Sequence, residues 1–421
     1  MTQAPSLAKH LDHAARLHGE TIALHGDGRT WTFAELLTGT RLLATTLGTG
    51  TQPLIATGNS HHLAHLAYAA SFENRPFWPV DRSKALPDKV LCPPETALII
   101  STSGSEGQAR AVLLGNTQLD AAASAANHVL SLGAGDLWLN CLPLHHIGGQ
   151  AILWRCARAA AGMLLHDGFV SEAIAADFKR HPVTHISLVP TMLARLIEAD
   201  IRPPPSLRVA LIGGAALSPP LYAKALAAGW PLYPSYGMSE TAALLAVFKP
   251  GDGDWHTGLV GQVMPGHDIR ITGAGRIVVR GPQVMSGYLD GSGVDAEGWL
   301  LTGDLGKLDP DGRLTVTGRA DDMLISGGRN VHPLEVESCL AACPGVRDIA
   351  VTGLPDDNWG DLVVALVVGD IEAAALRAHA RQHLPSSAQP RRIGFLEALP
   401  RNAAGKLERP ALRRLAAEIP V

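Results

Sequence analysis

Hydrophobic residues follow two different patterns along the chain. Up to about residue 255, apolar runs of strand length alternate with Ala- and Leu-rich stretches of helical length. This alternation predicts a parallel sheet whose strands are connected by crossover helices. The predicted strands are 54–56, 97–100, 137–142, 185–189 and 209–212, and the predicted helices are 61–71, 117–132, 170–180, 191–199 and 219–228.

Beyond residue 255 the pattern changes to short β runs separated by Gly, Pro and Asp-Gly turns, at 259–263, 270–272, 276–279 and 314–317. This part is predicted to be β-rich without crossover helices. A small α+β unit then follows, with helices 333–342 and 371–384 and strands 348–353 and 362–368. We therefore expect an α/β protein with a large N-terminal domain of several subdomains, residues 1–319, and a small α+β C-terminal domain, residues 320–421.

Composition narrows the class of protein. The chain has 421 residues, 46% of them hydrophobic, and a net charge of −4, so no global charge favours a nucleic-acid or membrane partner. No apolar run is long enough to span a bilayer, and no signal-peptide core is present near the N-terminus. Five cysteines without framework spacing are typical of reduced thiols, which indicates a cytoplasmic protein.

A polar loop follows the apolar run 97–100. Residues 101–110 read Ser-Thr-Ser-Gly-Ser-Glu-Gly-Gln-Ala-Arg. Glycines let a backbone curl so that many N–H groups and hydroxyls face one anion, and polyphosphate is the anion we expect. A Ser/Gly-rich surface turn is the alternative for this segment taken alone. The Gly-Lys-Ser/Thr ending of the common NTPase loop is absent.

Three further segments follow in order: Tyr-Pro-Ser-Tyr-Gly-Met-Ser-Glu-Thr at 233–241, Thr-Gly-Asp at 302–304 with Gly-Arg-Ala-Asp-Asp at 318–322, and Pro-Arg-Asn-Ala-Ala-Gly-Lys-Leu at 400–407. Together with the polar loop they resemble the adenylate-forming (AMP-binding) superfamily. The resemblance runs from about residue 20 to about residue 415, with a shortened N-terminal region. Acyl- and aryl-CoA ligases are the most similar members, in particular the o-succinylbenzoate–CoA and benzoate-type ligases.

The resemblance implies ATP-dependent activation of a carboxylic acid to an acyl-adenylate, followed by transfer to a thiol, with ATP, Mg²⁺ and CoA as cofactors. Each nucleotide-binding role falls on particular residues. The triphosphate loop would contain Thr102, Ser103, Gly104, Ser105 and Gly107, with Arg110 in the place of a lysine and Glu106 in the place of a threonine; Gly213, Gly214, Ala215, Tyr236 and Gly237 would surround the adenine; Asp304 would accept the ribose hydroxyls with Arg319 in support; Glu240 would bind Mg²⁺, and Thr241 would lie near the α-phosphate.

The resemblance also implies a mobile C-terminal domain. Lys406 would bridge the acyl carboxylate and the α-phosphate, Asp321 would be the hinge, and a loop with Gly327 and Gly328 would later admit the pantetheine arm. The acid would contact His146, Ile147, Gly148, Val189 and Met238, while His145 is expected to point away from His146. Since this set is apolar, with no cation for a second carboxylate and no acid for an α-amine, an amino acid is disfavoured and an aryl or medium-chain acyl acid is expected.

Two alternatives remain. The chain could load the phosphopantetheine of an acyl carrier protein in place of free CoA. It could also be a catalytically weakened binding protein, which the unusual Glu106 and Arg110 suggest. The presence of Glu240, Asp304 and Lys406 argues against this second alternative.

Overall fold

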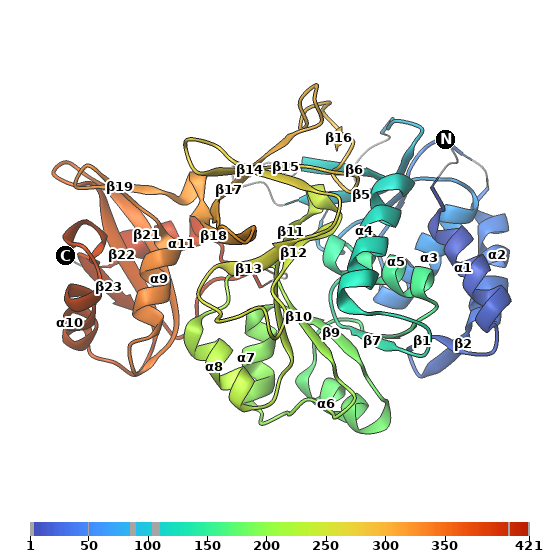
Figure 1. The fold of residues 1–421 in the computed structure, drawn as a ribbon, viewed down its shortest axis with the longest axis horizontal. Helices are drawn as coiled ribbons and strands as arrows, with labels where there is room; N and C mark the ends of the chain where they lie inside the picture. The colour runs from blue at the N-terminus through green and yellow to red at the C-terminus, as the bar shows by residue number, and fades with distance from the viewer. Residues whose placement is uncertain (1–3, 49, 85–89, 103–109, 403–404, 420–421) are drawn as a thin grey trace.

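Three β-sheets organise the protein, of which the computed structural model describes residues 4–48, 50–84, 90–102, 110–402 and 405–419. The first sheet has 13 strands and the other two have five strands each. The first two sheets and their helices form a large N-terminal body, and the third forms a smaller C-terminal body at the other end of the molecule (Figure 1). The two-domain α/β fold predicted from the sequence is confirmed.

One half of the 13-stranded sheet is parallel, in the order β1-β8-β7-β9-β10-β11, with β2 antiparallel at its edge. Its central strands are buried along their whole length, as expected for a sheet covered on both faces. The strands are β1 (Ile22–Gly26), β2 (Arg29–Thr32), β7 (Leu137–Asn140), β8 (Gly162–Leu165), β9 (His185–Leu188), β10 (Val209–Ile212) and β11 (Leu232–Met238).

Successive residues of each parallel strand point to two separate hydrophobic cores. In β10, Ala210 and Ile212 pack with α6, α7 and α8, whereas Val209 and Leu211 belong to the larger core with the other N-terminal helices. The helices are α1 (Leu7–His18), α2 (Phe33–Leu47), α3 (Ser60–Phe72), α4 (Asn116–Leu130), α5 (Ile147–Ala159), α6 (Ser171–Arg180), α7 (Pro190–Glu198) and α8 (Pro219–Ala227).

The other half of this sheet is antiparallel and begins at β11, whose later residues pair with β12. The β-rich segment predicted after residue 255 therefore continues the parallel sheet instead of forming a separate layer. Its strands are β12 (Ala243–Val247), β13 (Leu259–Val263), β14 (Asp268–Ile271), β15 (Arg276–Arg280), β17 (Leu300–Leu308) and β18 (Arg313–Arg319). The short 3₁₀ turn η1 (Ser239–Thr241) connects β11 to β12.

The second sheet has the order β16-β6-β5-β4-β3 and contains the strands on either side of the predicted phosphate loop. The hairpin β5–β6 is antiparallel, and β16 adds to the outer edge of β6. These strands are β3 (Leu54–Ala56), β4 (Phe77–Pro79), β5 (Thr96–Thr102), β6 (Arg110–Gly115) and β16 (Gly287–Tyr288).

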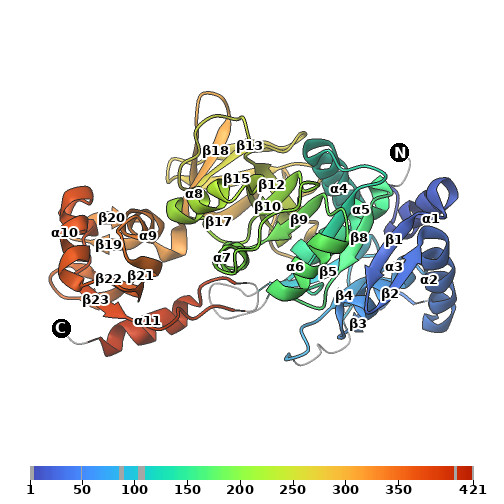
Figure 2. The ribbon, with the colours of Figure 1, turned by 90° about the horizontal axis from the view of Figure 1, so that it is seen from below.

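The third sheet forms after the turn η2 (Ala320–Asp322) and contains the order β20-β19-β22-β21, with β23 parallel to β22. Helix α9 contacts β18 and α8 of the N-terminal body. The segment before α11 extends from this sheet toward α7 (Figure 2). The elements are β19 (Leu324–Ser326), β20 (Arg329–Val331), α9 (Pro333–Ala341), β21 (Val346–Asp356), β22 (Gly360–Gly369), α10 (Ala373–His383), η3 (Ser386–Ala388), β23 (Arg392–Phe395) and α11 (Arg409–Glu418).

Within the described residues, no helix combines the length and the apolarity needed to cross a bilayer. All five cysteines lie in the described part of the chain, and each is a free thiol.

A buried ion pair holds α11 against the C-terminal sheet. Arg409 Nη1 lies 3.1 Å from Glu337 Oε1, which also accepts the Val351 N–H, and Arg409 Nε lies 3.2 Å from Asp322. Burial raises the pKa of the Glu337 carboxyl, and the Arg409 guanidinium acts in the opposite direction. The carboxylate of Glu337 therefore depends on Arg409 for its charge compensation.

We expect Arg409→Met to destabilise the C-terminal domain by about 3–5 kcal/mol, because it leaves a buried carboxylate without its partner. The double variant Glu337→Gln/Arg409→Met should recover part of that loss, since a neutral amide in place of the carboxylate would bury no charge. Differential scanning calorimetry of both variants measures the effect. Equal stability of the single and double variants would show that Glu337 does not depend on Arg409.

Candidate functional site

The carboxyl ends of four neighbouring parallel strands define the candidate site. His145 and His146 follow β7, Val189 follows β9, and Gly213 and Gly214 follow β10. Tyr236 lies in β11, just beyond the residues that pair with β10. Parallel strands end at the same edge of a sheet, which is where ligands bind in open α/β sheets. The residues predicted for the adenine and for the acid therefore lie along one edge, in the order of the strands β7-β9-β10-β11.

Glycine is required at two positions of this edge. A Cβ on Gly237 would lie 1.5 Å from the carbonyl oxygen of Ala243, because β12 turns back tightly against β11 there. Gly214 has a φ of +80°, which disfavours other residues, and a Cβ there would meet the side chain of Val189 at 3.2 Å. The backbone beside the predicted adenine pocket is thus fixed by close packing. Ala215 directly follows Gly214 and is partly exposed.

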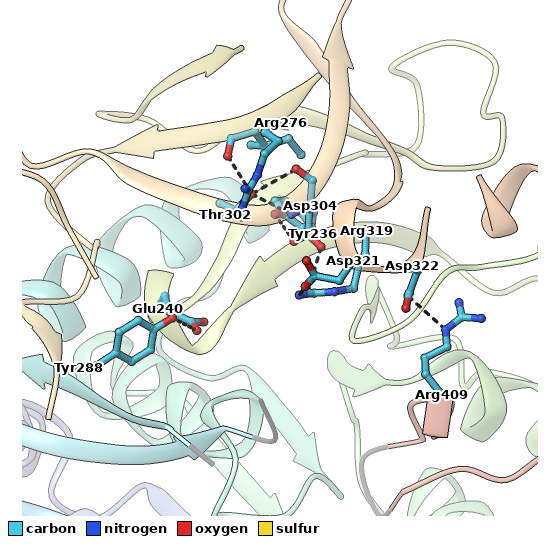
Figure 3. A network of polar contacts seen from close by, with 11 residues as sticks. Tyr236, Glu240, Arg276, Tyr288, Thr302, Asp304, Arg319, Asp321, Asp322 and Arg409 are labelled. Carbon is cyan, nitrogen blue, oxygen red and sulfur yellow. Dashed lines mark hydrogen bonds and ion pairs between the residues drawn. The ribbon is translucent and has the colours of Figure 1, made fainter. Parts of the chain in front are cut away.

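A network of polar side chains surrounds Asp304 (Figure 3). The register of β17 and β18 places Asp304 opposite Arg319, and Arg319 Nη1 donates to Asp304 Oδ1 at 3.3 Å. The Tyr236 hydroxyl donates to Asp304 Oδ2 at 2.6 Å, so both carboxylate oxygens have a donor. Burial, followed by the charge of Asp304, raises the pKa of Tyr236, which keeps this hydroxyl protonated. An oriented carboxylate of this kind can accept two hydroxyls of a diol.

Arg319 also links this carboxylate to the predicted hinge. Its Nη2 lies 3.4 Å from Asp321 Oδ2, within the turn that leads from β18 into the C-terminal sheet. One guanidinium therefore contacts the predicted ribose ligand and the predicted hinge residue at once.

The predicted metal ligand Glu240 lies in η1, just after β11. Its Oε1 accepts a hydrogen bond of 2.8 Å from the Tyr288 hydroxyl, a contact that the sequence analysis did not predict. Thr241 is fully buried, and its hydroxyl donates to backbone carbonyls of the same turn and accepts the Met238 N–H. The neighbouring Ser239 is partly exposed. Thr241 is thus placed to hold the turn, and Ser239 is the hydroxyl of this turn that is open to a ligand.

Most of the predicted phosphate loop, from Ser103 to Ala109 with Ser105, Gly107 and Glu106, lies outside the described residues. Thr102 ends β5 and Arg110 begins β6, and the Thr102 hydroxyl donates to the Arg110 carbonyl at 3.1 Å. The Arg110 guanidinium lies over the Tyr288 ring, 3.8 Å from its centroid. Both ends of the loop are therefore fixed by the β5–β6 hairpin.

Lys406 comes from the C-terminal domain, in a hairpin closed by backbone hydrogen bonds between Asn402 and Lys406 and between Gly405 and Asn402. Arg401 supports the hairpin, with its Nη1 on the Gly405 carbonyl and its Nη2 on Asp348. A Cβ on Gly405 would lie 2.9 Å from Val189 Cγ2 and 3.0 Å from Thr191 Oγ1. The Lys406 hairpin thus rests on the start of α7, at the strand edge that also carries Gly214.

The positive charge of Lys406 affects the pKa of His146. Burial lowers the pKa of His146 to about 4, and the charges of His145 and Lys406 contribute in the same direction. His146 is therefore a neutral ring at physiological pH. Lys406 and His146, which are 260 positions apart in the sequence, lie in one site.

The expectation that His145 points away from His146 is wrong. The two rings lie 4.4 Å apart, because His146 is the N-cap of α5 and the chain turns there instead of extending as a strand. His145 Nε2 lies 3.7 Å from Asp81 Oδ2, and the charge of Lys84 also acts on His146. The acid side of the site therefore has a cationic group, Lys84, that the sequence analysis did not include.

The remaining residues predicted for the site differ in burial and lie in different parts of the structure. Met238 is partly buried against the main core, Ile147 is buried in it, and a Cβ on Gly148 would meet the Leu142 side chain at 3.1 Å. Gly327 and Gly328 form the turn between β19 and β20, where a Cβ on Gly327 would meet the Trp359 ring at 3.0 Å.

Comparison with known proteins supports the resemblance. Residues 59–289 match the family of AMP-binding enzymes, and residues 335–406 match the AMP-binding enzyme C-terminal domain. Among curated proteins, the 2-succinylbenzoate–CoA ligase of Bacillus pumilus is 35% identical over 76% of this chain and 69% of its own length. The corresponding values for the same ligase of Geobacillus kaustophilus are 37%, 76% and 69%.

Solved structures agree with the sequence relatives. The O-succinylbenzoate coenzyme A synthetase of Bacillus subtilis in complex with AMP has a TM-score of 0.86 and 28% identity, with 98% of each chain covered. The same enzyme in complex with ATP and magnesium ion has a TM-score of 0.83 and 28% identity, covering 97% of this chain and 99% of that one. The prediction of an ATP-dependent acid–thiol ligase is confirmed, and the chain belongs to the family of AMP-binding enzymes.

Proposed function

We propose that this enzyme activates 2-succinylbenzoate, or an aryl acid of very similar shape, as its adenylate and transfers the acyl group to CoA. The observation that supports this acid is the 35–37% identity to 2-succinylbenzoate–CoA ligases over three quarters of the chain. Lys84, a cationic group near the acid side, also suits a substrate with a second carboxylate, and burial lowers the pKa of the neighbouring His145.

The residues of the site suit the first half-reaction. A carboxylate oxygen of the acid attacks the α-phosphorus of ATP, the new O–P bond forms, and the bond to pyrophosphate breaks. The main obstacle is electrostatic, since two anions must approach each other, so cations and oriented donors are needed and a protein nucleophile is not. Lys406 supplies the cation beside the acid, Glu240 would hold Mg²⁺ at the phosphates, and Asp304 would hold the ribose. The metal, when bound, would neutralise phosphate charge.

The second half-reaction needs a different domain orientation. The sulfur of the thiol attacks the acyl carbon, the bond to AMP breaks, and the thiol proton passes to solvent. In the present arrangement the Lys406 hairpin lies against Val189 and Thr191 at the site, while the turn with Gly327 and Gly328 belongs to another part of the C-terminal sheet. We propose that rotation about Asp321, with the domain boundary near residue 319, exchanges the two. CoA is the proposed acceptor, because the relatives are CoA ligases.

A panel of acids in ATP–pyrophosphate exchange tests the proposed substrate. We expect 2-succinylbenzoate to exceed 4-oxo-4-phenylbutanoate, which lacks the ring carboxylate, by about a hundredfold in kcat/KM, since a charge-assisted contact to that carboxylate would be lost. Preference for the monoacid, for benzoate or for a medium-chain acid would refute this substrate. Comparing CoA with holo acyl carrier proteins as acceptors in the same assay then identifies the thiol, and faster transfer to a carrier protein would refute CoA.

Replacing Lys406 by alanine should slow adenylate formation by about a hundredfold or more, since it removes a cation aimed at developing charge. Thioester formation from supplied acyl-adenylate should remain within about threefold of the parent, because Lys406 serves only one domain orientation. Pyrophosphate exchange measures the first step and thioester release measures the second. Equal losses in both steps would contradict the two-orientation mechanism. Lys224→Ala, in α8, is the matched control.

Asp321→Pro should have the opposite effect, because proline fixes φ and would restrict the hinge. Adenylation should continue at about the parental rate, and thioester formation should fall by about a hundredfold. Asp321→Ala is the matched control: it removes the contact with Arg319 but leaves the backbone free to rotate. Thioester formation by the proline variant at the parental rate would exclude Asp321 as the hinge.

A further inference from the structure

One short segment, residues 285–292, connects the predicted metal ligand to the end of the phosphate loop. It contacts Glu240 through Tyr288 and contacts Arg110 through Tyr288, Asp290 and Ser292. We propose that Tyr288 is a positioning residue for the metal-binding carboxylate of Glu240, and that Arg110 holds Tyr288 in place. This inference rests on the proposed function, because it takes Glu240 as the Mg²⁺ ligand.

The backbone of this segment is fixed on both sides. Tyr288 pairs with Val112 of β6, and the Leu289 N–H donates to the Ala111 carbonyl at 2.9 Å. On the other side, the Met285 N–H donates to the Glu240 carbonyl at 2.8 Å. By main-chain hydrogen bonds, the segment therefore joins η1, the turn between two strands of the large sheet, to β6 of the second sheet.

The Tyr288 side chain completes this connection. Its hydroxyl donates to Glu240 Oε1 at 2.8 Å, and Figure 3 shows the two side chains pointing toward each other. The ring is half-buried, and a Cβ on Gly293 would lie 3.1 Å from it, so the backbone there packs closely against the ring. Because Tyr288 holds Oε1, the Glu240 carboxylate has a fixed orientation and its Oε2 would remain available to bind a cation.

Arg110 contacts the same ring from the loop side. Its guanidinium lies 3.8 Å from the centroid of Tyr288, donates to Ser292 Oγ at 2.7 Å and lies 3.7 Å from Asp290 Oδ2. A planar guanidinium can stack on a ring and donate to a neighbour at the same time, which an ammonium group does less well. In this arrangement Arg110 acts on the site through Tyr288.

The test measures binding of ATP with and without Mg²⁺ by isothermal titration calorimetry, so it does not depend on turnover. Tyr288→Phe keeps the ring and removes the hydroxyl. We expect its dissociation constant for MgATP to rise about tenfold, because a hydrogen bond to a charged group is lost, while binding of ATP in excess EDTA changes less than twofold. Tyr222→Phe is the matched control, since Tyr222 stacks on Trp255 in another core and should bind both forms like the parent.

Arg110→Lys separates the second part of the inference. It should raise the MgATP dissociation constant about threefold in the parent and cause no further rise in the Tyr288→Phe background, because both changes would act on one unit. Equal weakening of MgATP and metal-free ATP by Arg110→Lys would show a direct phosphate contact and refute this part. An unchanged MgATP constant in Tyr288→Phe, or equal loss of both ligands, would refute the role of Tyr288.

The parent enzyme distinguishes failure of this inference from failure of the proposed function. If the parent itself binds ATP equally well with and without Mg²⁺, the metal role of Glu240 is refuted before any variant is considered. If the parent prefers MgATP and Tyr288→Phe keeps that preference in full, only the positioning role of Tyr288 is refuted. Each outcome therefore supports or overturns a stated part of the proposal.

Discussion

The tight reversal between β11 and β12 is the constraint on which the site depends. β11 pairs in parallel with β10 and then in antiparallel fashion with β12, and the register shifts between Tyr236 and Gly237. The chain reverses through Ala242 and Ala243, whose φ angles of 49° and 86° are unfavourable for residues with a Cβ. Buried donors hold this turn, among them the Gln283 amide on the Thr241 carbonyl. This strained reversal places Tyr236 and Glu240 at the edge of the sheet that forms the candidate site.

The second constraint is that the cation Lys406 comes from the C-terminal domain. In the proposed mechanism Lys406 leaves the site between the two half-reactions, which a residue of the rigid sheet edge could not do. Lys406 lies instead on a hairpin of the smaller domain. The contact of Gly405 with Val189 places the hairpin, and Arg401 with Asp348 keeps it in shape. Arg319 contacts both Asp304 and Asp321. Occupation of Asp304 by a ribose would therefore change the surroundings of Asp321, the proposed hinge, through the side chain of Arg319.

The sequence predicted β7, β9 and β10 of the large sheet, because buried central strands are continuous apolar runs, but it missed β1, β8 and β11 in the same parallel half. Each strand or helix that was predicted before residue 255 ends within two residues of the observed one. Helix α5 was missed for a physical reason: it begins with Ile-Gly-Gly and is buried on nearly all sides, so it has no amphipathic period. The position of His145 beside His146 could not be predicted without knowing that His146 caps this helix.

Contacts between segments that are distant in the sequence also could not be predicted from the pattern of hydrophobic and polar residues. The motif with Glu240 identifies a carboxylate, but its hydroxyl partner Tyr288 is 48 positions away and lies on a two-residue strand that has no hydrophobic pattern of its own. This strand and the residues that follow it explain why arginine is compatible with position 110. A guanidinium there has a ring, a hydroxyl and a carboxylate within reach, all from one segment. The substitution that looked like a weakness in the sequence is accompanied by a set of contacts that uses the planar shape of arginine.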